Sequence, residues 1–275
     1  MATSLQASGA PPVDVILEWN AIALEANVLD HNGPEGNGAD LSGTQGPPAS
    51  ARVLGIVHAA MFDAYNSVDP KYDPYLIQVP LARGASADAA VAKAAHDVLT
   101  ALIPAGKPMY DIALLKTLKR VASPIQKIRG LLIGAEVAQN ILALRSGDIV
   151  DPADLPDYVP TGAPGNHDVD PNNPGQGFIS PGFGAVPPFG VPDITVFRAP
   201  PPPALDSMEY ADAFNEVKAL GIFRGGNSGA VAPTDDETYV IANYWSYNGS
   251  PGTGTPPRLY NQIARLIAQQ KGNKV

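Results

Sequence analysis

The chain has 275 residues, 45% of them hydrophobic and only 16% charged, so it can bury the core of one large helical domain or two small ones. Its formal net charge of -9 gives no electrostatic reason to bind nucleic acid or an anionic membrane surface. The lack of cysteine excludes disulfides and thiolate chemistry, but it does not decide the compartment. Residues 1–12 carry neither a positive charge nor an apolar run, and no apolar stretch approaches the ~20 residues of a membrane span. We therefore expect a soluble chain without a signal peptide, in the cytoplasm or in a compartment that the sequence does not identify.

Apolar positions three and four residues apart predict a series of helices in residues 1–150. Ser86 and Ser123 are placed to cap two of them, and Pro124 suits a first helical turn. The expected helices cover residues 13–30, 49–67, 86–103, 107–122 and 124–146. The expected core face of the last of these comprises Ile128, Leu131, Leu132, Ala135, Val137, Ala138, Ile141 and Leu142.

Residues 151–205 hold nearly half of the chain's 29 prolines, a density that excludes helix. We expect an ordered arm wrapped over the helices, since a disordered linker would carry fewer aromatic anchors than Phe178, Phe183, Phe189 and Phe197. Helices then resume at capping patterns, namely Asp206 with Glu209, Thr234 with Glu237, and Thr255 before Pro256. In the last helix, the apolar positions Leu259, Ile263, Leu266 and Ile267 form one face.

No segment shows the alternation of a strand, so the predicted class is all-α. The predicted organisation is a helical bundle over residues 1–150, a Pro/Gly-rich ordered arm over 151–205, and further bundle helices over 206–275.

The histidines give no metal-binding pattern. Neither Glu-x-x-His nor His-Glu-x-x-His occurs, and none of the four histidines has a partner at metal-ligand spacing. His58 and His96 fall inside predicted helices. We interpret both as hydrogen-bonded interior or surface histidines.

Charged residues on the first two predicted helices offer two interpretations. Glu18 and Glu25 share a face of the first helix, as Arg52 and Asp63 share a face of the second. Paired across the helices they could form a carboxylate site. Ion pairs between helices are the favoured interpretation, because two carboxylates on a helix are not a specific signal.

Two later segments resemble ligand loops only in part. Residues 168–172 place oxygen-bearing side chains at alternate positions like a calcium loop, but Asn173 and Ile179 stand where an EF-hand needs Gly and Glu. Residues 225–229 are glycine-rich without the lysine of a phosphate loop. Both segments are therefore predicted to be turns.

An ordered series of segments resembles a known family. They are residues 16–20 (ILEWN), 46–52 (GPPASAR), 58–65 (HAAMFDAY), 173–178 (NPGQGF), 197–206 (FRAPPPPALD), 244–249 (YWSYNG) and 254–263 (GTPPRLYNQI). In this order and spacing they are similar to the N-terminal half of vanadium-dependent haloperoxidases, whose vanadate pocket is shared with type 2 phosphatidic-acid phosphatases. The resemblance covers most of residues 13–265, and it implies that the helices form the first half of a haloperoxidase-type bundle.

The resemblance implies a peroxidase that uses vanadate, hydrogen peroxide and a halide, for which we expect bromide, to form a hypohalous acid equivalent. Lysine and arginine side chains neutralise the vanadate oxygens in this family, and one histidine binds the metal. The family's Ser-Gly-His is absent here, because the four Ser-Gly pairs continue with Ala10, Thr44, Asp148 and Ala230. No catalytic or metal-binding residue can therefore be transferred to this chain.

The expected partner is accordingly a C-terminal half, or a second chain, that carries the vanadate pocket. We expect this chain alone to be inactive and such units to form a homo-oligomer. The resemblance also implies that Pro47 and Asn248 lie near the mouth of a substrate channel, although both could simply shape turns. Alternatives to a haloperoxidase are an acid phosphatase of the same superfamily and a non-catalytic helical scaffold or interaction module.

Overall fold

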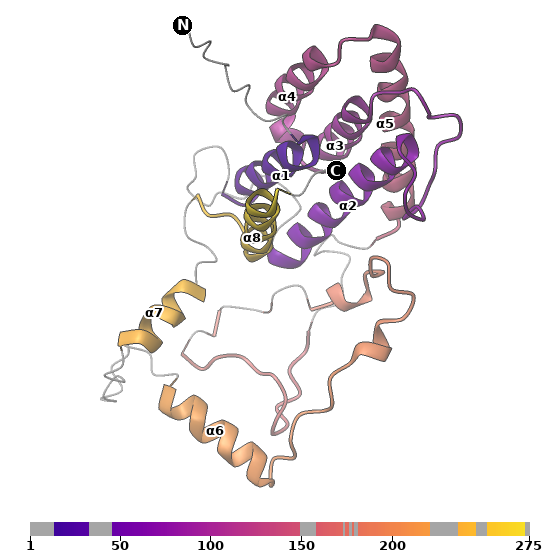
Figure 1. Ribbon diagram of the computed structural model, residues 1–275. Helices are drawn as coiled ribbons and strands as arrows, with labels where there is room; N and C mark the ends of the chain where they lie inside the picture. The colour runs from indigo at the N-terminus through magenta and orange to yellow at the C-terminus, as the bar shows by residue number, and fades with distance from the viewer. Residues whose placement is uncertain are drawn as a thin grey trace, which may run out of the picture. The chain divides into compact units, whose positions relative to one another are not determined.

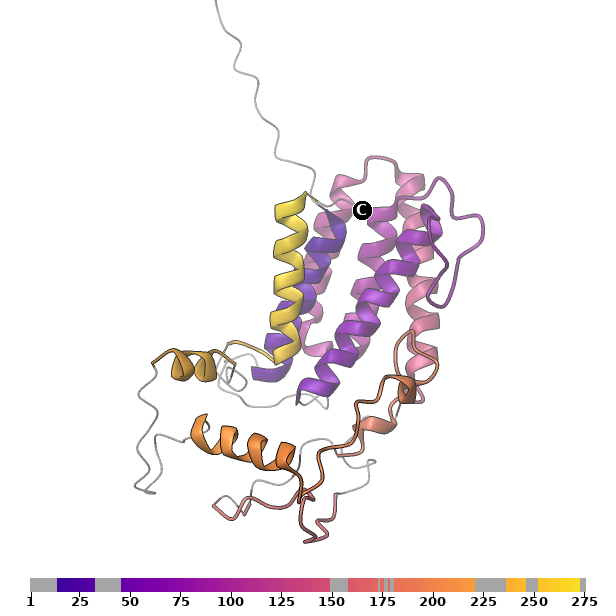
Figure 2. The same ribbon diagram turned by 60° about the horizontal axis from the view of Figure 1, so that its bottom comes forward.

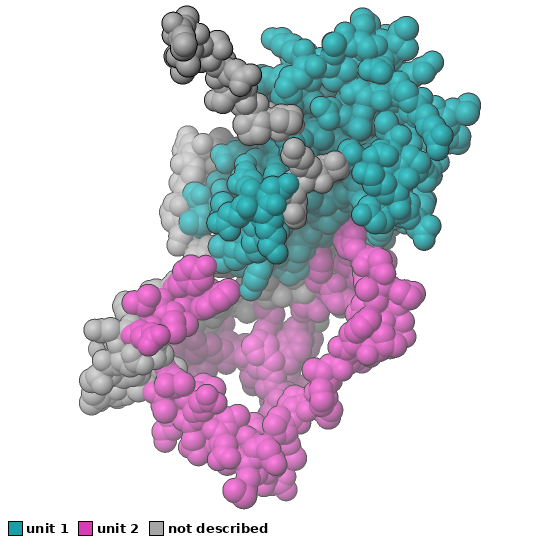
Figure 3. Space-filling view, in the orientation of Figure 1, with its two compact units in different colours: residues 1–151, 251–275 teal, residues 152–250 magenta. Residues whose placement is uncertain are grey.

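A computed structural model describes residues 14–32, 46–148, 158–172, 174–175, 178, 181–220, 236–245 and 252–272. Within these ranges the regular structure is helical and contains no strand, which confirms the all-α class. The chain forms two compact units, residues 1–151 with 251–275 and residues 152–250 (Figure 3). No helix of the described part is both long and apolar enough to cross a membrane.

The first unit is a bundle built around one central helix. Its helices are α1 (Val15–Asn32), α2 (Gly46–Val68), α3 (Ala87–Leu102), α4 (Lys107–Arg120), α5 (Pro124–Arg145) and α8 (Pro256–Lys271), with a short 3-10 turn at Pro104–Gly106. Helix α3 packs against α1, α2, α4 and α5 (Figure 1). It is rich in alanine, and these small side chains let neighbouring helices approach on several sides. The fully buried residues of α3 therefore include Ala90, Val91, Ala94 and Val98.

The caps expected at Ser86 and Ser123 are confirmed. The Ser86 hydroxyl accepts a hydrogen bond from the Ala89 amide at 3.2 Å, and the Ser123 hydroxyl accepts one from the Gln126 amide at 3.3 Å. Helix α2 begins at Gly46, before the expected start after Pro48. Proline fits in a first helical turn because the N–H that it lacks would have no partner within the helix.

Two glycines set the face that α5 turns to α3. A Cβ atom at Gly130 would lie 2.5 Å from the Ser86 carbonyl oxygen, and one at Gly134 would lie 2.3 Å from the Ala90 carbonyl oxygen. The helices therefore meet backbone to backbone along this edge.

The predicted core face of α5 is wrong in part, because Ile128 and Leu132 are 58% and 66% exposed. Its predicted members Val137, Ala138 and Ile141 are buried.

The second unit holds the proline-rich region and two helices. Its described elements are the 3-10 turns Phe183–Ala185 and Ile194–Phe197, and the helices α6 (Met208–Leu220) and α7 (Asp236–Trp245). As the proline density predicts, the described residues of 158–205 contain no α-helix. The course of this arm over the bundle helices stays a prediction.

Aromatic rings form a small cluster within the second unit. The Phe178 ring packs edge-on against Tyr158 and His167, with ring centroids 4.7 Å and 5.1 Å apart. Phe197, another expected anchor, is 74% exposed.

The start of α6 differs by one residue from the expectation. The Ser207 hydroxyl accepts from the Tyr210 amide at 3.1 Å, so the capping residue is Ser207 and not Asp206. Thr234, the expected cap of α7, lies outside the described residues.

Candidate functional site

A partly buried polar network centred on His58 joins α1, α2 and α8. His58 Nδ1 lies 2.7 Å from the Leu54 carbonyl oxygen, which can only accept, so Nδ1 carries the proton. His58 Nε2 therefore accepts from Asn20 Nδ2 at 2.8 Å. The same Asn20 amide donates to Asn261 Oδ1 at 3.3 Å, and Asn261 Nδ2 donates to the Pro257 carbonyl at 3.0 Å.

This network holds His58 as a neutral imidazole. Burial lowers the pKa of His58, and the hydrogen bond to the Leu54 carbonyl opposes that effect. Both ring nitrogens are engaged, so His58 offers no free lone pair to a metal or a proton. The prediction of a hydrogen-bonded histidine is confirmed.

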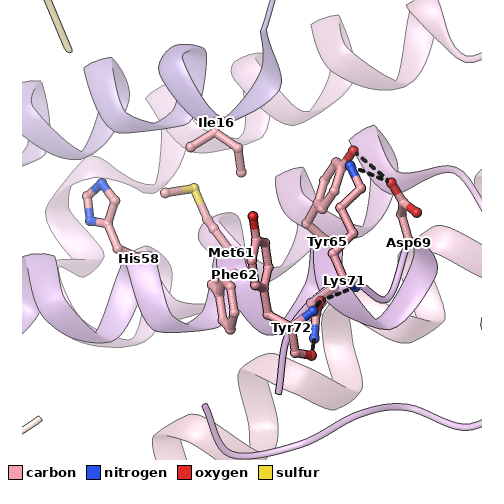
Figure 4. A pocket seen from close by; sticks show the side chains of 9 residues that line it. Ile16, His58, Met61, Phe62, Tyr65, Asp69, Lys71 and Tyr72 are labelled. Atoms are coloured by element: carbon pink, nitrogen blue, oxygen red, sulfur yellow. Dashed lines mark hydrogen bonds and ion pairs between the residues drawn. The ribbon is translucent and has the colours of Figure 1, made fainter. Parts of the chain in front are cut away.

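A hollow of about 330 Å³ lies on one side of His58 (Figure 4). Figure 4 shows His58 at one end and the polar side chains of Tyr65, Asp69 and Lys71 at the other. Lys71 Nζ forms an ion pair with Asp69 at 3.1 Å, and the Tyr65 hydroxyl donates to Asp69 at 3.4 Å. The complete lining is Ile16, His58, Met61, Phe62, Tyr65, Asn66, Asp69, Lys71 and Tyr72.

A second hollow, of about 580 Å³, is an open cleft between α2 and α8. His58 and Asn261 contribute polar atoms to it, and most of the remaining wall is apolar. Pro47 lies in this wall, at the N-terminal end of α2; that it borders a substrate channel stays a prediction. Asn248 lies outside the described residues. The complete lining is Pro47, Ala51, Leu54, Gly55, His58, Pro256, Pro257, Tyr260 and Asn261.

The predicted charged residues of α1 do not form a carboxylate site. Glu18 makes a two-pronged ion pair with the guanidinium of Arg120 on α4, through Arg120 Nη1 at 3.2 Å and through Nη2. Glu25 is exposed to solvent. The interpretation of Glu18 as a partner in an ion pair between helices is therefore confirmed.

The charged residues of α2 also have structural roles. The Asp63 carboxylate accepts hydrogen bonds from the amides of Tyr75, Leu76 and Ile77 at 2.7, 2.8 and 3.0 Å. It thereby holds the loop after α2 against the helix. Arg52 Nε contacts Asp148 Oδ2 at 2.7 Å, which ties α2 to the segment after α5. The spacing on one helix could not reveal these partners, since they lie in other segments.

No metal site is found among the described residues. They contain no group of three or more His, Cys, Asp or Glu side chains that could hold a metal ion. In the calcium-like segment, Asp170 Oδ1 accepts from the Asn172 amide at 2.9 Å, as expected of a turn. The glycine-rich residues 225–229 lie outside the described part of the chain.

The architecture places the chain among all-α bundle proteins. Residues 12–178 match the family model described as the vanadium chloroperoxidase N-terminal domain. Over 92% of its length, the chain is 30% identical to vanadium chloroperoxidase from Curvularia inaequalis. The chain therefore belongs to the vanadium-dependent haloperoxidase family. The match covers 48% of that relative, so the chain spans about half the length of the curated relative it matches.

The described residues do not fit the vanadate that this family implies. An oxyanion of that charge needs several convergent cationic donors. Arg52 and Arg120 are instead paired with carboxylates, and Arg258 Nε donates to the Leu24 carbonyl at 3.2 Å. His58, in the hollowed region, has both nitrogens engaged.

Proposed function

We propose that this chain forms the N-terminal part of a vanadium-dependent haloperoxidase that oxidises a halide with hydrogen peroxide to a hypohalous acid equivalent. Bromide is the halide we expect. The vanadate pocket comes from a C-terminal half or from a partner chain. The observation that carries this proposal is the match of residues 12–178 to the N-terminal domain of the family. The alignment with the full-length relative, which covers about half of that protein, agrees with it.

In this proposal, the chain supplies a rigid wall beside the pocket and no vanadate ligand. The partly buried hydrogen bonds of Asn20, His58 and Asn261 link α1, α2 and α8 to one another. The cleft that contains Pro47 would then form part of the entrance to the active site.

The experiment compares the isolated chain with the native protein that contains it. Bromination of an organic acceptor is measured with bromide and hydrogen peroxide, before and after removal of vanadate. We expect vanadate-dependent bromination by the native protein and none by the isolated chain. Stoichiometric binding of vanadate to the isolated chain, measured by titration calorimetry, would contradict the placement of the pocket elsewhere.

Two further measurements separate the alternatives. Hydrolysis of a phosphomonoester without bromination would identify an acid phosphatase of the superfamily. Intact mass spectrometry of the native protein tests for a non-catalytic module. A single 28.6 kDa species that neither binds vanadate nor brominates would support that module and overturn the proposal.

A further inference from the structure

Helix α8 lies beside α1 (Figure 2), and polar groups make hydrogen bonds between the two segments. Asn27 Oδ1 on α1 accepts from the amide and the hydroxyl of Thr255 at 3.1 and 3.2 Å. Arg258 Nε donates to the Leu24 carbonyl at 3.2 Å. The polar side of α8 therefore holds the helix in the bundle. In an ordinary amphipathic helix of a soluble protein, the polar side faces water instead.

Several apolar side chains on the opposite side of α8 are exposed to solvent over a large part of their surface. Tyr260, Leu266 and Ile267 are 59%, 56% and 45% exposed, and Ile263 is 39% exposed. Tyr260, Ile263 and Ile267 follow one another at spacings of three and four residues, so they form one stripe along the helix. A contiguous exposed apolar stripe on a helix marks a surface that another element covers.

The stripe continues into the cleft between α2 and α8. Tyr260 belongs to both, since it lines the cleft together with Pro257. Opposite it, α2 contributes Ala51 and Gly55, one helical turn apart. Small residues at this spacing let a further helix approach the α2 backbone closely. We refer to this continuous surface as the α2–α8 groove, and its residues are Pro47, Ala51, Gly55, Pro257, Tyr260, Ile263, Leu266 and Ile267.

We infer that the α2–α8 groove seats the apolar face of a helix from the vanadate-bearing half of the enzyme. This inference rests on the proposed function. About half of the relative's length has no counterpart in this chain. A polypeptide about as long as this chain is therefore the source of the helix that we place in the groove. The exposed stripe of α8 carries no charge, so the matching helix face is apolar.

A second copy of this chain would fit the groove less well. Hydrogen bonds of Asn27 with Thr255 hold the start of α8 against α1 of its own chain, and entering the cleft of another copy would break them. A symmetric pair would cover one α8 stripe with the other and leave the wall of Ala51 and Gly55 open. A helix laid between α2 and α8 covers both.

This chain contains no cysteine, so peptide mapping can identify an introduced thiol within it in the native protein that also contains the vanadate-bearing half. Ile263→Cys places a thiol in the stripe, and Leu266→Cys repeats the test at a second position. Gln269→Cys is the matched control, because Gln269 is an exposed polar residue of the same helix outside the stripe. The rate of maleimide modification is measured in the isolated chain and in the native protein, with each variant's helix content checked by circular dichroism.

We expect modification at positions 263 and 266 to slow at least about tenfold in the native protein, while the rate at position 269 stays the same. A benzophenone group at position 263 should crosslink to a helix of the vanadate-bearing half, identified by mass spectrometry. Unchanged modification rates at positions 263 and 266, or a crosslink to a second copy of α8, would overturn the inference.

The outcomes separate this inference from the proposed function. A native protein that brominates while positions 263 and 266 stay reactive contradicts the groove alone. A protected stripe in a native protein without vanadate-dependent bromination contradicts the proposed function alone. A native protein without a second half overturns both.

Discussion

His96 shows how a single side chain links two helices in this bundle. Its Nδ1 lies 2.7 Å from Asp97 Oδ1, and its Nε2 lies 2.8 Å from Asp111 Oδ1 on α4. Lys93 and Lys107 pair with the same two carboxylates. Both ring nitrogens therefore face acceptors, and the charged imidazolium satisfies both. The hydrogen bond with Asp97 is the main cause of the raised pKa of His96; the bond with Asp111 adds to it, and burial opposes it.

We predict that this raised pKa makes the stability of the bundle depend on pH. The pKa of histidine in an unfolded chain is about 6.5, so the contribution of His96 is fully present below that pH. It is lost as the pH rises through the higher pKa of the folded state. The free energy of unfolding is measured by urea titration at pH values from below the unfolded pKa of His96 to above its folded pKa. As the pH rises over this range, the free energy of unfolding should fall more in the parent protein than in His96→Gln. Equal pH dependence in the two proteins would contradict the prediction. The lowered pKa values of Asp97 and Asp111 act at more acidic pH.

Partners of individual residues are the part of the site that the sequence could not predict. Helical periodicity placed His58 and His96 inside helices, and a hydrogen-bonded role was correct for both. The partners of His58 come from elsewhere, however. Asn20 precedes it by 38 residues, and Asn20 in turn bonds to Asn261, 241 residues further along the chain. Only tertiary packing brings such groups together.

At the scale of elements, helix starts were predictable where the signal is local. The caps at Ser86 and Ser123 bond to amides three residues away, so a short stretch of sequence contains the whole interaction. The buried face of α5 depends instead on which neighbour the helix meets. Glycine at positions 130 and 134 brings α5 against the α3 backbone, and that contact leaves Ile128 and Leu132 exposed.

We predict that Gly134→Ala lowers the free energy of unfolding by about 2 kcal/mol, in the range for overpacked cores. The added Cβ would lie 2.3 Å from the Ala90 carbonyl oxygen and 2.9 Å from the Ala94 amide nitrogen. Both are backbone atoms, so α5 must move away from α3. Alanine gains about 1 kcal/mol in helix propensity over glycine, which offsets only part of this strain.

Urea denaturation of the parent and variant proteins measures this effect. Gly147→Ala is the matched control, because a Cβ at Gly147 meets nothing within 4 Å and should change stability little. An unchanged or increased free energy of unfolding for Gly134→Ala would show that α3 and α5 are not in close backbone contact.

The orientation of helix α8 also depends on the neighbours that it meets. Its sequence correctly predicts that the helix starts at Pro256 and that the apolar residues share one face. The Thr255 hydroxyl does not cap the helix, because it donates to Asn27 instead. The direction of the apolar face depends on hydrogen bonds with Asn20 and Asn27. These two residues lie outside α8, so the sequence of the helix alone does not reveal them. The apolar pattern alone would have placed this face in the core.

For the whole molecule, the arrangement of helices predicts an order of local stability. Helix α3 is surrounded by four other helices, and its buried residues include Ala90, Val91, Ala95 and Val98. Helix α8 has no buried residue, and its main contacts with other helices are those with α1 and α2. Elements with few buried apolar contacts open without global unfolding, whereas central helices exchange their amide hydrogens only when the whole domain unfolds.

We therefore predict that hydrogen exchange, followed by mass spectrometry on the isolated chain, is slowest in α3 and at least about tenfold faster in α8. In the native protein with its vanadate-bearing half, exchange in α8 should slow towards the rate of α3, because the covered stripe adds apolar contacts to each opening. Exchange in α3 serves as the internal control, since its surroundings in the bundle are already complete. Equal protection of α3 and α8 in the isolated chain would show that the polar contacts with α1 suffice to hold α8, without any element over its apolar face.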